Sequence, residues 1–117
     1  MDRLRPEAFL PLTPVAFEIL LALAEGEQHG YSVMREVERR SAGAVTLHPG
    51  TLYRALARLL ESGLIEELDE RPDPAHDDER RRYYRITARG REVGRAEALR
   101  LESQLAAART RLLGLRA

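Results

Sequence analysis

Six apolar residues near the C-terminal end of the chain repeat at the spacing of a coiled-coil seam. They follow one another at intervals of three, four, three, four and three residues: Ala98, Leu101, Leu105, Ala108, Leu112 and Leu115. This spacing predicts one long helix over residues 88–115, with Thr87 as its N-terminal cap. The body of about 75 residues that precedes it is too small to cover a helix of roughly 40 Å. The seam therefore predicts pairing with another chain.

Composition limits the class of protein. A length of 117 residues fits one small domain with an appended element, and 44% hydrophobic residues are enough for a core. The absence of cysteine excludes disulfides and a cysteine nucleophile. We find no signal peptide and no run long enough to span a bilayer, so no membrane partner and a cytoplasmic location are expected. A net charge of zero is weak evidence against nucleic-acid binding, because such domains are usually basic.

Two helices are predicted in the first part of the chain, over residues 14–25 and 30–40. Thr13 is a typical cap for the first helix, since it is followed by a proline in the first turn. A short polar turn, residues 27–29, joins the two helices. Beyond them, residues 45–47 predict a very short strand.

A third helix is predicted from Pro49 to Gly63, and it is amphipathic. Four leucines share one face: Leu52, Leu56, Leu59 and Leu60. At about 100° per residue, Arg54 lies almost opposite these leucines. The helix therefore has an apolar back and a polar front.

A charged hairpin is predicted next. Residues 64–69 and 82–87 alternate as strands do, and Tyr84 and Ile86 are expected in the core. The connecting loop contains an acidic block, residues 77–79, that runs directly into Arg80, Arg81 and Arg82. His76 and the acidic block contain metal-binding groups, but they are sequential in a loop and no second cluster completes a shell, so no metal and no cofactor are expected.

Three stretches resemble the PadR family of bacterial transcriptional regulators: LTPVAFEILLALAEGEQHGYSVMREV, LHPGTLYRALARLLESGLIEE and RRYYRITARGRE. The expected fold class is mainly α with a small β-hairpin: a winged helix-turn-helix DNA-binding domain over residues 1–87 and a long C-terminal dimerisation helix over residues 88–117. The single C-terminal helix looks like the short-tailed branch of the family. The resemblance implies a homodimeric, sequence-specific regulator of an operator in double-stranded DNA, most often a repressor and sometimes released by a small-molecule effector.

The resemblance also gives roles to polar residues. Arg54 would read a guanine edge, and Thr51 would reach a phosphate or a thymine methyl. The hairpin arginines would reach phosphates or the minor groove. The alternative is a solvated loop in which they form only local ion pairs. The full expected DNA-binding set is Gln28, His29, Tyr31, His48, Gly50, Thr51, Tyr53, Arg54, Arg58, Arg80, Arg81 and Arg82, and the expected dimerisation set is the six-residue seam. His29 could equally cap the second helix, and Tyr53 could be half-buried.

Two other classes of protein compare less well with the sequence. A winged-helix module that binds a protein partner, without specific DNA binding, would suit the neutral charge. An enzyme is not expected, because the sequence contains no nucleophile–base pair, no phosphate-cradling loop and no metal cluster.

Overall fold

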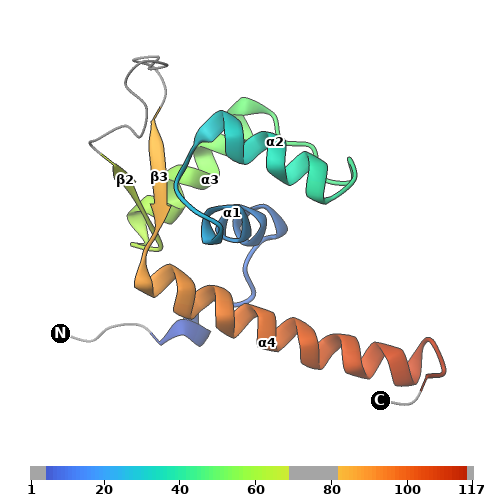
Figure 1. The fold of residues 1–117 in the computed structure, drawn as a ribbon. Coiled ribbons are helices and arrows are strands. Elements are labelled where there is room, and N and C mark those ends of the chain that lie inside the picture. Colours follow the sequence, from blue (N-terminus) through green and yellow to red (C-terminus); the bar gives the residue numbers. More distant parts are fainter. Residues whose placement is uncertain (1–4, 69–81, 116–117) are drawn as a thin grey trace.

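The computed structural model describes residues 5–68 and 82–115. Its elements are a short 3-10 helix η1 (Pro6–Phe9), then α1 (Pro14–Ala24), β1 (Gln28–His29), α2 (Gly30–Arg40), α3 (Pro49–Glu61), β2 (Ile65–Leu68), β3 (Tyr83–Ile86) and α4 (Ala88–Arg111). In Figure 1, α1 lies at the centre, α2, α3 and the strands surround it, and α4 runs beneath and extends beyond them. The fold is mainly helical with a small antiparallel sheet, as the sequence predicts.

Local signals set the helix starts. Thr13 Oγ1 accepts a hydrogen bond from the Ala16 amide at 3.1 Å, and Thr87 Oγ1 accepts one from the Gly90 amide at 3.0 Å. Both threonines satisfy first-turn N–H groups that have no partner inside the helix. These two predicted caps are confirmed.

The sheet has the strand order β1-β3-β2, and both pairings are antiparallel. Residues 28–29, predicted to be a turn, pair with Tyr83 and Tyr84 as the third strand. The strand predicted at residues 45–47 is wrong, because this segment is irregular. There the Val45 amide donates to Ser41 Oγ at 3.0 Å, so the loop is closed by a local hydrogen bond instead of a strand ladder.

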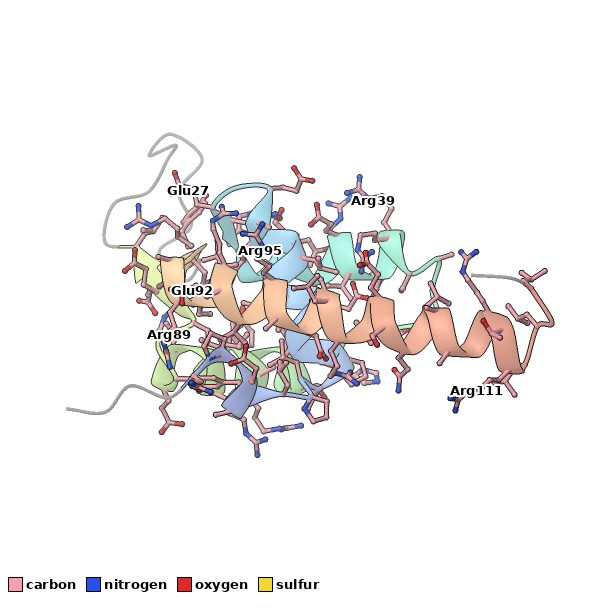
Figure 2. The ribbon with its side chains drawn as sticks, turned by 90° about the horizontal axis from the view of Figure 1, so that it is seen from below. Glu27, Arg39, Arg89, Glu92, Arg95 and Arg111 are labelled. Atoms are coloured by element: carbon pink, nitrogen blue, oxygen red, sulfur yellow. The ribbon has the colours of Figure 1, made fainter. Side chains whose placement is uncertain are left out.

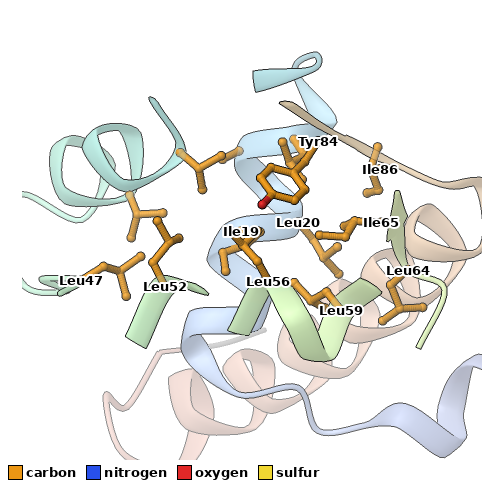
Figure 3. Packing of buried hydrophobic residues seen from close by; sticks show 14 of the residues in the cluster. Ile19, Leu20, Leu47, Leu52, Leu56, Leu59, Leu64, Ile65, Tyr84 and Ile86 are labelled. Carbon is orange, nitrogen blue, oxygen red and sulfur yellow. The ribbon is translucent and has the colours of Figure 1, made fainter. Parts of the chain in front are cut away.

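The core is formed around α1 and the apolar back of α3 (Figure 3). Its buried members are Ile19, Leu20, Ala22, Leu23, Val33, Val37, Leu47, Leu52, Leu56, Leu59, Leu64, Ile65, Tyr84, Ile86 and Val93. Each fully buried leucine or isoleucine contributes about 1.5–3 kcal/mol to folding. The predicted burial of Tyr84 and Ile86 is confirmed, and α3 is held with its opposite face outward.

A tight junction joins the hairpin to α4. Thr87 is the single residue between β3 and α4, and its hydroxyl donates to the Gly63 carbonyl at 2.7 Å. Its amide donates to the Leu64 carbonyl at 3.1 Å. At Gly90 a Cβ would lie 2.0 Å from the Leu64 oxygen. Only glycine therefore allows the first turn of α4 to approach the start of β2 so closely.

The segment before α1 is fixed to α4 through Glu97, whose side chain is 2% exposed. The Leu12 amide donates to Glu97 Oε2 at 3.1 Å, and Arg100 Nε donates to Oε1 at 2.5 Å. The hydrogen bond from Arg100, helped by that from Leu12 and opposed by burial, lowers the pKa of the Glu97 carboxyl. The Arg89 guanidinium lies over the Phe9 ring at 5.2 Å from its centroid. Two contacts thus hold η1 and the following residues against α4.

α4 ends earlier than the sequence predicts. Its last residue is Arg111, so Leu112 is the C-terminal cap and Leu115 lies outside the helix. Gly114 has φ 67°, and the Leu115 amide turns back to the Arg109 carbonyl at 2.8 Å. A left-handed glycine ends a helix in this way. The helical part of the seam runs from Ala98 to Ala108.

Candidate nucleic-acid interface

α3 has the apolar back and polar front that its spacing predicts. Leu52, Leu56 and Leu59 are buried, whereas Arg54 and Arg58 are exposed and Tyr53 is 50% exposed. Arg54 Nη2 lies 3.4 Å from Thr51 Oγ1, so the two predicted contact residues are neighbours on the outward face. A helix with this division can lay its charged side against a polyanion while its back remains in the core.

The N-terminal end of α3 is open to an anion. His48 occupies the cap position without a side-chain hydrogen bond, and Pro49 starts the helix. His48 and Gly50 are both exposed. Because first-turn amides carry partial positive charge, an uncapped helix start of this kind favours a phosphate group.

Tyr53 brings α3 against the start of α2. A Cβ at Gly30 would lie 3.3 Å from the Tyr53 hydroxyl, so the tyrosine ring packs directly on this glycine. Tyr31, in the first turn of α2, is 52% exposed and lies parallel to the His29 ring at 6.5 Å. The polar start of α2 and the outward face of α3 therefore form one continuous surface.

Gln28 and His29 also have structural roles. Gln28 Nε2 donates to the Ala22 carbonyl at 2.7 Å. His29 Nδ1 accepts from the Ser32 amide at 3.1 Å, so the alternative role of His29 as the cap of α2 is confirmed. The His29 ring also meets the Tyr83 ring edge to face at 5.4 Å. Contact of these two residues with DNA stays a prediction.

The sequence reading missed Arg35. Its guanidinium lies 5.8 Å from the centre of the Tyr31 ring, on the exposed side of α2. Arg35 also lines a polar groove of about 290 Å³ with Gln28, Ser32, Glu36 and Arg39. The four-residue intervals from Tyr31 to Arg35 and on to Arg39 place all three on one helical face, and this spacing was the available signal.

Arg82, at the loop end of the hairpin, and Arg85, within β3, face acidic residues. Arg82 Nη1 lies 3.7 Å from Glu67 Oε1, and Arg85 pairs with both Glu66 and Glu27. Exposed pairs of this kind contribute about 0–1 kcal/mol each. Arg82 thus forms the local ion pair that was the alternative to phosphate contact. Arg80, Arg81, His76 and the acidic block 77–79 lie outside the described residues.

A second exposed surface lies on α4. Leu101 and Ala108 are half-buried, Ala98 is exposed, Leu105 is 51% exposed and Leu112 is 82% exposed. Figure 2 shows Arg89 near the inner end of α4 and Arg111 near the outer end, where the helix extends past the body. Exposed leucines along one side of a helix are the kind of surface that a partner covers.

Residues 5–68 and 82–115 contain no group of three or more His, Cys, Asp or Glu side chains placed to hold a metal. Among the same residues, no helix is long and apolar enough to cross a membrane.

The paired helices α2 and α3 with a hairpin beside them define a winged helix-turn-helix protein. The model of the "Transcriptional regulator PadR-like family" matches residues 19–96. The chain belongs to this family of transcriptional regulators.

Two individual proteins are similar to this chain. An uncharacterized 37.1 kDa protein in transposon TN4556 of Streptomyces fradiae is 39% identical over 80 residues, which cover 68% of this chain. The match spans only 21% of that larger protein. A transcriptional regulator from Clostridium thermocellum superposes with a TM-score of 0.71 at 26% identity, over 84% of this chain and 89% of that one.

Bacillus subtilis PadR in complex with operator DNA shares the fold. It superposes with a TM-score of 0.57 at 20% identity, over 70% of this chain and 45% of that one. At this level of identity the likeness concerns the fold alone.

Proposed function

We propose that the protein is a homodimeric, sequence-specific DNA-binding repressor that is released from its operator by a small molecule. The observation that carries the proposal is the outward face of α3, with exposed Arg54 and Arg58 and an uncapped helix start. The start of α2 adjoins this face through the contact between Tyr53 and Gly30. The site of action would be the cytoplasm.

In this proposal α3 enters the major groove, whose base edges carry sequence information. Arg54 forms two hydrogen bonds to a guanine, and the first turn of α3 binds a phosphate. Tyr31 and Arg35 on α2 contact the flanking backbone, and Arg80 and Arg81 in the hairpin reach a further phosphate. The backbone contacts supply affinity and register, whereas Arg54 supplies sequence preference.

The dimer would form through α4, where Leu105 of the seam is 51% exposed and Leu101 is half-buried. Two chains related by a twofold axis would present two copies of α3 to two half-sites. A dimer that occupies an operator excludes other proteins from that DNA, and a ligand that lowers its affinity for DNA would relieve the repression. A similar fold bound to operator DNA in Bacillus subtilis PadR supports this proposal.

Selection of bound fragments from random or genomic DNA tests the central claim, followed by binding isotherms at several salt concentrations. Arg54→Ala should cost about 1–3 kcal/mol on the selected site and flatten the preference at one position per half-site. Arg81→Ala should weaken binding to all sequences alike and lower the salt slope by about one.

Failure to enrich any sequence would refute specific DNA binding. It would favour the second candidate, a winged-helix module for a protein partner. That candidate is supported by the neutral net charge and by the pairing of Arg82 and Arg85 with acidic residues.

A further inference from the structure

A groove of about 450 Å³ separates α3 from the segment that precedes and begins α1. Leu12, Val15 and Ala16 line one wall, Ala55 lines the α3 wall, and Arg54 and Arg58 border it from α3. The groove therefore combines an apolar interior with two guanidinium groups. Its volume lies within the usual range for small-molecule sites, about 300–1,000 Å³.

The groove is built by two fixed walls. Arg54, Ala55 and Arg58 lie on one side of α3, because residues three and four apart share a helical face. The opposite wall is held in place by the hydrogen bond from the Leu12 amide to buried Glu97. The segment is thus tied to α4 while it lines the groove.

The charges at the groove favour an anion. Among the described residues, no carboxylate lines the groove and none pairs with Arg58. Within residues 5–68 and 82–115, the Arg54 guanidinium makes one long hydrogen bond, to Thr51 Oγ1 at 3.4 Å. DNA phosphates would satisfy both arginines but would leave the apolar walls unused, so the groove fits a ligand with an apolar body and one anionic group.

The end of α4 from a second copy is a poorer occupant. Leu112 and Leu113 are exposed and apolar, but Arg109 and Arg111 lie beside them in the chain and are also exposed. Inserting this end into the groove would bring these arginines towards Arg54 and Arg58. Like charges in proximity disfavour that arrangement.

We propose that the groove binds a small amphipathic monocarboxylate, with its carboxylate between Arg54 and Arg58 and its hydrocarbon body against Leu12, Val15 and Ala16. Binding itself is independent of the function proposed above. Its consequence rests on that function: an occupied groove withdraws two arginines of α3 from DNA, so that ligand and operator compete.

Titration of the isotopically labelled full chain, without DNA, tests the binding step. Octanoate should shift the amide signals of residues 12–16 and 54–59 saturably, with a Kd on the order of 1 mM for a ligand of this size. 1-Octanol, which has the same chain without the charge, should bind roughly threefold to tenfold more weakly, and octylamine should not saturate. Equal Kd values for octanoate, 1-octanol and octylamine would overturn the proposal, and so would the absence of a saturable shift with octanoate.

Ala16→Leu should fill the groove without changing charge and should weaken octanoate binding at least about tenfold. Ala44→Leu adds the same side chain in the exposed loop after α2, away from the groove, and serves as the control. Arg58→Met keeps the aliphatic part of the side chain at an exposed position and removes the charge. It should lower the affinity for octanoate to that for 1-octanol. Unchanged octanoate binding in both groove variants would contradict the assignment. A gain in affinity on Leu113→Ser would show that a second copy fills the groove instead.

DNA binding then tests the competition. Octanoate at several times its Kd should lower the operator affinity of the wild-type chain but not that of Ala16→Leu. An unaffected operator affinity in the saturated wild-type protein would refute competition. If the wild-type chain binds no specific DNA at all, the proposed function fails, while the titration without DNA still decides the groove.

Discussion

The two halves of α4 are stabilised in different ways although they form one continuous helix. In residues 88–100 Gly90, Val93 and Glu97 are buried against the body of the same chain, whereas none of residues 101–111 is buried. The inner half buries the Glu97 carboxylate, whereas Leu105 in the outer half is 51% exposed. Burial along this helix therefore depends on the neighbouring part of the chain and not on the polarity of the side chain. Glu97 is buried beside its hydrogen-bond donors, Leu12 and Arg100, whereas Leu105 is half-exposed where α4 extends past the body.

The comparison predicts that substitutions in the inner half affect folding and that substitutions in the outer half affect association. Three substitutions test this division.

Gly90→Ala should have the largest effect. Its Cβ would lie 2.0 Å from the Leu64 oxygen and 2.8 Å from Ile86 Cγ1, so α4 must move away from the hairpin. We expect a loss of at least about 3 kcal/mol in the free energy of unfolding, measured with urea. Gly94→Ala is the control, because its Cβ would meet only Leu20 Cδ1 at 3.9 Å, and it should stabilise the helix by up to about 1 kcal/mol. Equal stabilities of the two variants would contradict a tight junction.

Leu105→Arg should separate association from folding. In a dimer each seam leucine occurs twice, and each buried copy contributes about 1.5–3 kcal/mol, so the dimer dissociation constant should rise at least about a hundredfold. The monomer should keep its folded body, since Leu105 is 51% exposed in the single chain. Light scattering and circular dichroism at micromolar concentration measure both properties. Gln104→Arg adds the same charge beside the seam and should remain dimeric; a folded Leu105→Arg dimer would show that the seam is not the interface.

Glu97→Gln should have the smallest and a pH-dependent effect. The folded-state pKa of Glu97 lies below its ordinary value of 4.5, chiefly because of the Arg100 hydrogen bond. Its contribution to stability is therefore complete above the unfolded pKa and is lost as pH falls through the folded pKa. The variant should be less stable than wild type by roughly 1 kcal/mol at pH 7, and the difference should shrink below about pH 4. Unfolding curves from pH 7 to pH 3 measure it, with exposed Glu102→Gln as control; a difference that stays constant over this range would refute the charged role.

Sequence patterns predicted the elements whose signals are local. Thr13, Thr87 and the leucines of α3 act within one or two turns of a helix, and their roles are confirmed. The strand at residues 28–29 was missed because two residues show no alternation and their partner lies more than fifty positions away. The seam spacing predicts a helix to residue 115, but the left-handed conformation of Gly114 ends α4 earlier.

The candidate site also combines features that local sequence patterns predict with features that depend on distant contacts. The exposure of Arg54 follows from helical spacing, but the groove beside it exists only because residues 12–16 return to α3 in the folded chain. Glu92, Glu97 and Glu102 are alike in the sequence, and only the position of the Leu12 amide distinguishes Glu97. Contacts between distant segments carry no periodic signal, so such features could not be predicted from one sequence.

The junction at Thr87 has a consequence for the spacing between the two half-sites of the proposed operator. Because one residue, hydrogen-bonded on both sides, separates β3 from α4, no flexible linker lets the winged-helix body turn independently of the helix. In the proposed homodimer, the crossing angle between the two copies of α4 would therefore fix the distance between the two copies of α3. Half-sites that differ in spacing from this distance by even one base pair, about 3.4 Å along the axis, would not be contacted together without bending of the DNA.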